Sequence, residues 1–106
     1  MIPLFKVFMP PGTSRAVSKT LRTGYIAEGE KVRQFARSIA RFVGNPYVVP
    51  ISSCTMALTI AYELAGIKRG DEVISTPLTC IATNVPLLQL GAKIVWADCE
   101  PHTGMI

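Results

Sequence analysis

From residue 47 onward, short β-rich segments alternate with apolar helical segments, and only a few residues connect them. The expected strands cover residues 47–51, 72–76 and 92–97, and the expected helices between them cover residues 56–65 and 79–90. Strands that alternate with helices in this way predict right-handed crossovers and a parallel sheet covered on both faces. The sequence therefore predicts an α/β fold built on a βαβαβ parallel sheet.

The first part of the chain has a different pattern. Residues 1–12 are rich in proline and predict an extended arm. Thr13 and Ser14 are candidate N-caps for a short helix. Apolar residues then recur at three- and four-residue steps over 30–43, which predicts an amphipathic helix that Gly44 ends.

The balance of charged and apolar residues restricts the class of protein. Charged residues make up 17% and hydrophobic residues 49% of the chain, with a net charge of +4; a globular domain averages about 25% charged. This composition excludes disorder. Apolar runs fall short of the ~18 residues of a membrane span, and no signal peptide is predicted. We expect the uncharged surface to be covered by the rest of a longer polypeptide, by a partner subunit, or by both.

The change of pattern divides the chain into two parts. Residues 1–45 are expected to form the arm and two helices, and residues 46–106 to begin a larger α/β domain that is incomplete here. A basic stripe on the first long helix, formed by Arg33, Arg37 and Arg41, is expected to face solvent, because no aromatic residues interleave with it for stacking on nucleic acid.

The reactive residue types give few catalytic candidates. Cys54, Cys80 and Cys99 are widely spaced without a Cys-x-x-Cys pair, which predicts free thiols in a reducing cytoplasm and no metal site. His102 lies alone in a turn and is expected to be exposed. Because no Ser–His–acid or Cys–His arrangement can be built, no catalytic residue is assigned within this chain.

Two positions meet the rule that ligands bind at the carboxyl ends of strands in an open α/β sheet. The first is the small polar turn at residues 52–55, where the first N–H groups of a helix and the hydroxyls of Ser53 and Thr55 offer donors to a phosphate. On spacing alone, a simple helix cap is the commoner explanation. The second is the turn containing Thr79 and Cys80, which is also typical of an ordinary helix start.

Four segments in register resemble the N-terminal part of the DegT/StrS family of pyridoxal-phosphate-dependent sugar aminotransferases. They are residues 2–4 (IPL), 24–32 (GYIAEGEKV), 52–58 (SSCTMAL) with 66–67 and 70–74, and 79–84 (TCIATN) with 91–93 and Asp98. The resemblance covers nearly the whole chain. It implies the start of the large domain of a fold-type-I transferase, the cofactor pyridoxal 5'-phosphate (PLP), and a homodimer with shared active sites.

The resemblance also implies roles for the small polar turn. Ser53, Cys54, Thr55 and Met56 are expected to bind the cofactor phosphate, with the hydroxyl of Thr55 as the side-chain donor. Family members often have glycine at position 54, and the small Cys54 is compatible with the same turn.

Two further residues gain expected roles from the resemblance. Cys80 stands where the family often has an aromatic residue stacked on the pyridine ring, so stacking is expected to be weaker or arranged differently. Tyr25, in the glycine–aromatic loop, is a candidate contact to the sugar substrate or to the partner subunit.

The reaction that the resemblance implies moves an amino group from an amino acid to a nucleotide-linked keto-sugar, for polysaccharide or natural-product synthesis. The lysine that forms the Schiff base is expected after residue 106. Some relatives replace it with histidine and act as dehydratases, which stays open. A non-catalytic phosphate- or nucleotide-binding module is an alternative of another class. A desulfurase or lyase of the same fold is disfavoured by the loop at Gly24.

Overall fold

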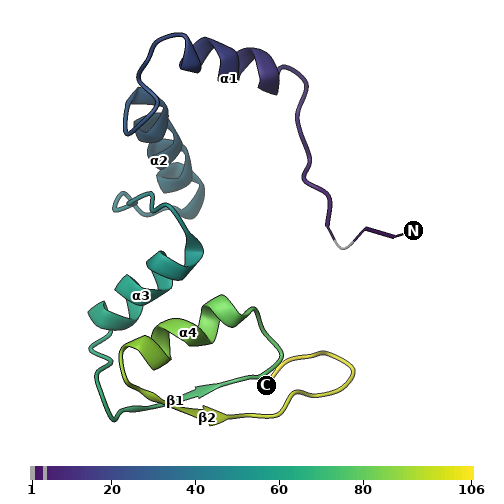
Figure 1. Cartoon of the computed structure of the whole chain (residues 1–106), viewed down its shortest axis with the longest axis vertical. Helices are drawn as coiled ribbons and strands as arrows, with labels where there is room; N and C mark the ends of the chain where they lie inside the picture. Colours follow the sequence, from purple (N-terminus) through teal and green to yellow (C-terminus); the bar gives the residue numbers. More distant parts are fainter. Residues whose placement is uncertain (1, 4) are drawn as a thin grey trace. The chain divides into compact units, whose positions relative to one another are not determined.

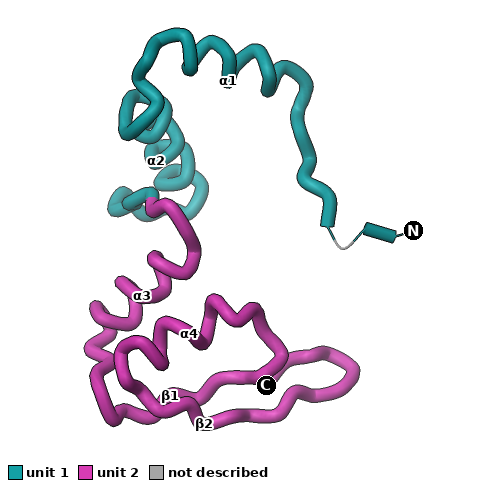
Figure 2. The backbone as a smooth tube through the Cα atoms, in the orientation of Figure 1, with its two compact units in different colours: residues 1–50 teal, residues 51–106 magenta. Residues whose placement is uncertain are grey.

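A computed structural model describes residues 2–3 and 5–106 of the chain, so Met1 and Leu4 of the predicted arm lie outside the described residues. The chain falls into two compact units, which divide between residues 50 and 51 (Figure 2). The first unit is helical, and the second combines helices with a parallel pair of strands.

In the first unit, helix α1 covers Thr13–Leu21 and follows an arm whose described residues are exposed and irregular. The prediction that Thr13 or Ser14 caps this helix is wrong, because the N-cap is Gly12 at φ 88°. The hydroxyl of Thr13 instead donates to the carbonyl of Pro10 at 2.7 Å. That bond closes the turn before the helix, so this side chain is not used as a cap.

Helix α2 covers Glu30–Val43, which confirms the prediction from periodicity. It ends at Gly44, which adopts a left-handed conformation with φ 72° that glycine tolerates best. The helix contains no buried residue, and Phe42 on its predicted apolar face is 87% exposed. The amphipathic pattern is therefore real, but residues of this unit do not cover the face.

The second unit contains a helical crossover between two parallel strands (Figure 1). The elements in chain order are α3 (Cys54–Leu64), β1 (Glu72–Ser75), α4 (Ile81–Gln89) and β2 (Lys93–Trp96). Glu72 pairs with Lys93 and Ser75 with Trp96, so the two strands end side by side. The predicted parallel α/β arrangement is confirmed for these elements.

The predicted strand at residues 47–51 is wrong, because this segment is irregular and mostly exposed. A strand needs a hydrogen-bonded neighbour, and among the described residues β1 and β2 pair only with each other. Pro50 also lacks a backbone N–H that could join a ladder. The β propensity of Tyr47, Val48 and Val49 is thus not sufficient without a partner strand.

The core of the second unit lies where α4 packs against the sheet. Leu87 is 1% exposed, and Ala92, just before β2, is also buried. Gly91 permits the tight turn between them: its φ is 78°, and an added Cβ would lie 3.2 Å from the Cβ of Arg69. The sequence of α3 is apolar nearly all round, which favours burial on most sides, but the helix has no buried residue in this chain. Helix α4 packs against α3 but covers only part of its apolar surface.

Candidate functional site

The carboxyl ends of β1 and β2 form one edge of the second unit. The ladder continues one residue past the strands, where the Ala97 N–H donates to the Ser75 carbonyl at 2.8 Å. The polypeptide therefore leaves β1 and β2 at the same end of the sheet (Figure 1). This is the edge at which parallel α/β sheets bind ligands.

The N-terminus of α3 is built around Ser53. This residue is extended, with φ −152° and ψ 154°, and its Oγ accepts a hydrogen bond from the Met56 N–H at 3.2 Å. Its carbonyl accepts from the Ala57 N–H at 3.0 Å. Of the first four N–H groups of the helix, those of Cys54 and Thr55 keep no acceptor among the described residues.

The side chains of this turn leave room for a ligand. Ser53 and Cys54 are exposed and Thr55 is half-buried. The carbonyl of Thr55 accepts from the Thr59 hydroxyl at 3.0 Å, whereas the Thr55 hydroxyl itself bonds to no described residue. Two free N–H groups, one free hydroxyl and the positive end of a helix dipole are donors of the kind that bind a phosphate. The turn therefore fits a phosphate.

Met56 plays a different part from its three neighbours. Its N–H is already bonded to Ser53 Oγ, so a phosphate would have to share or replace that bond. Met56 as a whole is 49% exposed. The four residues predicted to bind the phosphate thus lie together at one helix end: Ser53, Cys54, Thr55 and Met56. The free donors among them belong to Cys54 and Thr55.

Cys80 is the N-cap residue of α4, and its thiol is exposed and makes no capping bond. Helix α4 packs against α3, and the Tyr62 hydroxyl of α3 donates to the Thr83 carbonyl of α4 at 3.3 Å. The start of α4 and the turn at Ser53 therefore belong to neighbouring helices of one unit. Asp98 follows β2, and its Oδ1 accepts from the Cys99 N–H at 2.8 Å.

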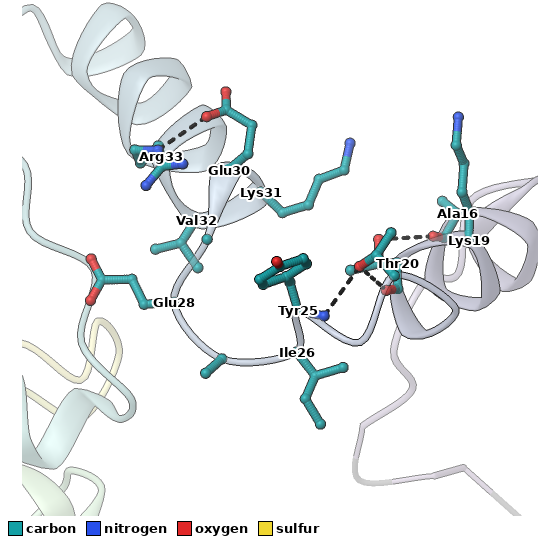
Figure 3. A pocket seen from close by; sticks show the side chains of 13 residues that line it. Ala16, Lys19, Thr20, Tyr25, Ile26, Glu28, Glu30, Lys31, Val32 and Arg33 are labelled. Atoms are coloured by element: carbon teal, nitrogen blue, oxygen red, sulfur yellow. Dashed lines mark hydrogen bonds and ion pairs between the residues drawn. The ribbon is translucent and has the colours of Figure 1, made fainter.

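Tyr25 belongs to the first unit and lies in an open pocket of about 700 Å³ between the end of α1 and the start of α2. In Figure 3 its ring lies between the two helix ends, with Lys31 extending on the α2 side. Tyr25 is 82% exposed, and its N–H donates to the Thr23 hydroxyl at 3.2 Å. The hydrogen bond to Thr23 thus holds the backbone at Tyr25, while the aromatic ring is free for contacts.

The basic stripe of α2 is partly neutralised. Glu30 accepts from Arg37 at 2.6 Å and from Arg33 at 3.0 Å. The Arg37 guanidinium, followed by that of Arg33, lowers the pKa of Glu30. These pairs are exposed, so they contribute little to stability.

Sequence reasoning missed Asn84, which is 8% exposed inside α4. Its Oδ1 accepts from the Ser75 hydroxyl at 2.6 Å, and its Nδ2 donates to the Thr76 carbonyl at 3.2 Å. The signal in the sequence is a polar amide in the middle of a mainly apolar helix, because a buried amide must find partners. Asn84 thereby fastens α4 to the carboxyl end of β1.

Within the described part of the chain, no His, Cys, Asp and Glu side chains gather in a group of three or more that would hold a metal ion. No helix among these residues combines the length and hydrophobicity needed to cross a bilayer.

The sequence model of the DegT/DnrJ/EryC1/StrS aminotransferase family matches residues 11–106. The chain belongs to this family. The family resemblance read from the four segments is thereby confirmed, and the segments that carry the candidate phosphate turn and Cys80 lie inside the matched region.

Individual proteins are also similar to this chain over most of its length. The spore coat polysaccharide biosynthesis protein SpsC of Bacillus subtilis (strain 168) is 42% identical over 87 residues, which are 82% of this chain and 22% of SpsC. A sugar aminotransferase described as putative, Spr1654 from Streptococcus pneumoniae in its PLP form, superposes with a TM-score of 0.84 at 28% identity, over 96% of this chain and 26% of Spr1654.

A dehydratase is also structurally similar. GDP-4-keto-6-deoxymannose-3-dehydratase, solved with a trapped PLP–glutamate geminal diamine, has a TM-score of 0.80 at 25% identity, over 92% of this chain and 27% of the dehydratase. These structures confirm the predicted fold, the start of a fold-type-I transferase. The chain spans roughly a quarter of the length of the relatives that it matches.

Proposed function

We propose that this chain forms the N-terminal part of a PLP-dependent aminotransferase that acts on nucleotide-linked keto-sugars, with an amino acid such as glutamate as the amino donor. Family membership, the PLP form of Spr1654 and the polysaccharide pathway in the name of SpsC support this proposal. The observation that carries it is the turn at the start of α3, where two N–H groups and one hydroxyl are free for a phosphate.

In this proposal each predicted site residue has a defined part. Cys54 and Thr55 donate their N–H groups to the cofactor phosphate, and Thr55 adds its hydroxyl. Ser53 shapes the turn, and Met56 contributes through its backbone. Cys80 lies beside the pyridine ring. When bound, PLP supplies an electron sink for carbanion chemistry.

The remaining predictions concern the rest of the protein. Residues 46–106 begin the large PLP-binding domain, and the Schiff-base lysine lies beyond residue 106, so the chain holds the phosphate without carrying out the transfer. Tyr25 contacts the sugar substrate or the partner subunit. A homodimer agrees with the exposed apolar side chains of α2, including Phe35 and Phe42. A cytoplasmic location agrees with the free thiols of Cys54, Cys80 and Cys99.

The test uses the complete protein that carries these residues. It is titrated with PLP while the visible absorbance of the cofactor is followed, and then supplied with glutamate and a nucleotide-linked keto-sugar. The proposal predicts PLP binding and an aminated sugar product in the mass spectrum. Complete protein that does not bind PLP would contradict it, and nucleotide binding by a stable 106-residue monomer would favour the non-catalytic module.

A sugar dehydratase is the second candidate, supported by the similarity to GDP-4-keto-6-deoxymannose-3-dehydratase. The turn at Ser53 serves both reactions equally, because both would hold the same phosphate. The products separate them: the aminotransferase product retains a new nitrogen atom on the sugar ring, whereas the dehydratase product loses an oxygen atom and gains no nitrogen.

A further inference from the structure

The turn at residues 76–80, between β1 and α4, lacks regular secondary structure, and its residues from Pro77 to Cys80 are exposed. Apolar burial therefore does not hold Cys80 in place. Its position depends on the polar bonds at the two ends of the turn. Those bonds converge on Thr76 and Asn84.

Thr76 connects three parts of the second unit. Its carbonyl accepts from Asn84 Nδ2 of α4 at 3.2 Å. Its hydroxyl accepts from the Leu78 N–H inside the turn at 3.1 Å and lies 2.7 Å from the Sγ of Cys99, in the segment after β2. The carboxyl ends of both strands and the start of α4 are thus joined through one residue.

Asn84 lies one helical turn after Cys80, so it is placed to fix the first turn of α4. Both polar atoms of its buried amide are used, with Ser75 Oγ at 2.6 Å on one side and the Thr76 carbonyl on the other. A buried amide with both ends bonded specifies one orientation, because any other leaves a desolvated group unpaired.

We infer that Asn84 is a positioning residue: it holds the first turn of α4 against the carboxyl end of β1 and thereby sets where Cys80 meets the cofactor ring. Asn84 does not touch the ring in this arrangement and acts only through Cys80. Because the inference rests on the proposed function, its test must separate a misplaced Cys80 from a failure to bind PLP.

The experiment measures alkylation of individual cysteines in the complete protein, by peptide mass spectrometry, with saturating PLP and without it. In the wild type we expect PLP to protect both Cys54, under the phosphate, and Cys80, beside the ring. Ser75→Ala removes one bond to Asn84, and Asn84→Leu removes both. We expect Ser75→Ala to raise Cys80 alkylation in the PLP-bound protein about fivefold, the factor for losing one neutral hydrogen bond.

Asn84→Leu is expected to raise the Cys80 rate further, with Cys54 still protected in both variants. Cys54 is an internal control, because general unfolding or loss of PLP would expose both thiols. Thr59→Val is the matched variant: it loses one side-chain hydrogen bond in α3, away from this network, and should leave the Cys80 rate unchanged.

The outcomes separate the two proposals. Wild-type protein that does not bind PLP contradicts the proposed function. PLP-bound Ser75→Ala and Asn84→Leu proteins in which Cys80 is protected as in the wild type overturn the role of Asn84 alone. If Asn84→Leu does not fold, Ser75→Ala decides the question by itself, since its side chain loses only one hydroxyl.

Discussion

Replacing Thr55 with valine tests the phosphate turn with little disturbance of the fold. The two side chains have nearly the same shape, and they have similar helix propensities. The Thr55 hydroxyl bonds to no described residue, so its removal leaves no buried partner unsatisfied. We therefore expect the free energy of unfolding to change by less than about 0.5 kcal/mol.

The effect on cofactor affinity should be much larger. A hydrogen bond to a charged group contributes about 1.5–3 kcal/mol, which corresponds to a loss of roughly 10- to 100-fold in PLP affinity for Thr55→Val. The N–H groups of Cys54 and Thr55 remain in the variant, so binding is weakened and not abolished.

The assay is a titration of the complete apoprotein with PLP, followed by visible absorbance, for wild type, Thr55→Val and Thr59→Val. Thr59 lies one turn further along α3, and its hydroxyl donates to the Thr55 carbonyl at 3.0 Å. It controls for a threonine-to-valine change in the same helix and should leave PLP affinity unchanged. Wild-type affinity in Thr55→Val would refute the assignment of its hydroxyl to the phosphate.

Two further predictions concern the second unit. Leu87→Ala empties a position that is 1% exposed and should lower the free energy of unfolding by about 2–5 kcal/mol; denaturant unfolding with a smaller loss would contradict the core described here. The His102 N–H, donating to the Glu100 carboxylate at 3.0 Å, lowers the pKa of Glu100. The ionised Glu100 should therefore stabilise the fold fully above the pKa that Glu100 has in the unfolded chain. This stabilisation should be lost as pH falls through the lower pKa of Glu100 in the folded protein. NMR titration of the Glu100 side chain checks this, and a pKa at or above the usual glutamate value would argue against the bond.

Local sequence patterns predict the elements whose determinants are local. Apolar periodicity and a C-terminal glycine define α2, and β-branched residues between turn signals define β1 and β2. The helix cap at Ser53 was also predictable, because the cap and the free donors after it depend only on neighbouring residues. That these donors hold a phosphate stays a prediction.

Features that depend on distant partners were not predictable in the same way. Residues 47–51 have the composition of a strand but no neighbour among the described residues with which to pair. Helix α3 has the composition of a buried helix, and its surroundings in this chain do not bury it. Asn84 was missed because its partners, Ser75 and Thr76, come from another element.

The most direct test of the central claim is a crystal structure of the complete protein with PLP bound. The account predicts that the phosphate oxygens accept hydrogen bonds from the N–H groups of Cys54 and Thr55 and from the Thr55 hydroxyl, at the first turn of α3. Electron density for the phosphate at any other place in the protein would contradict it.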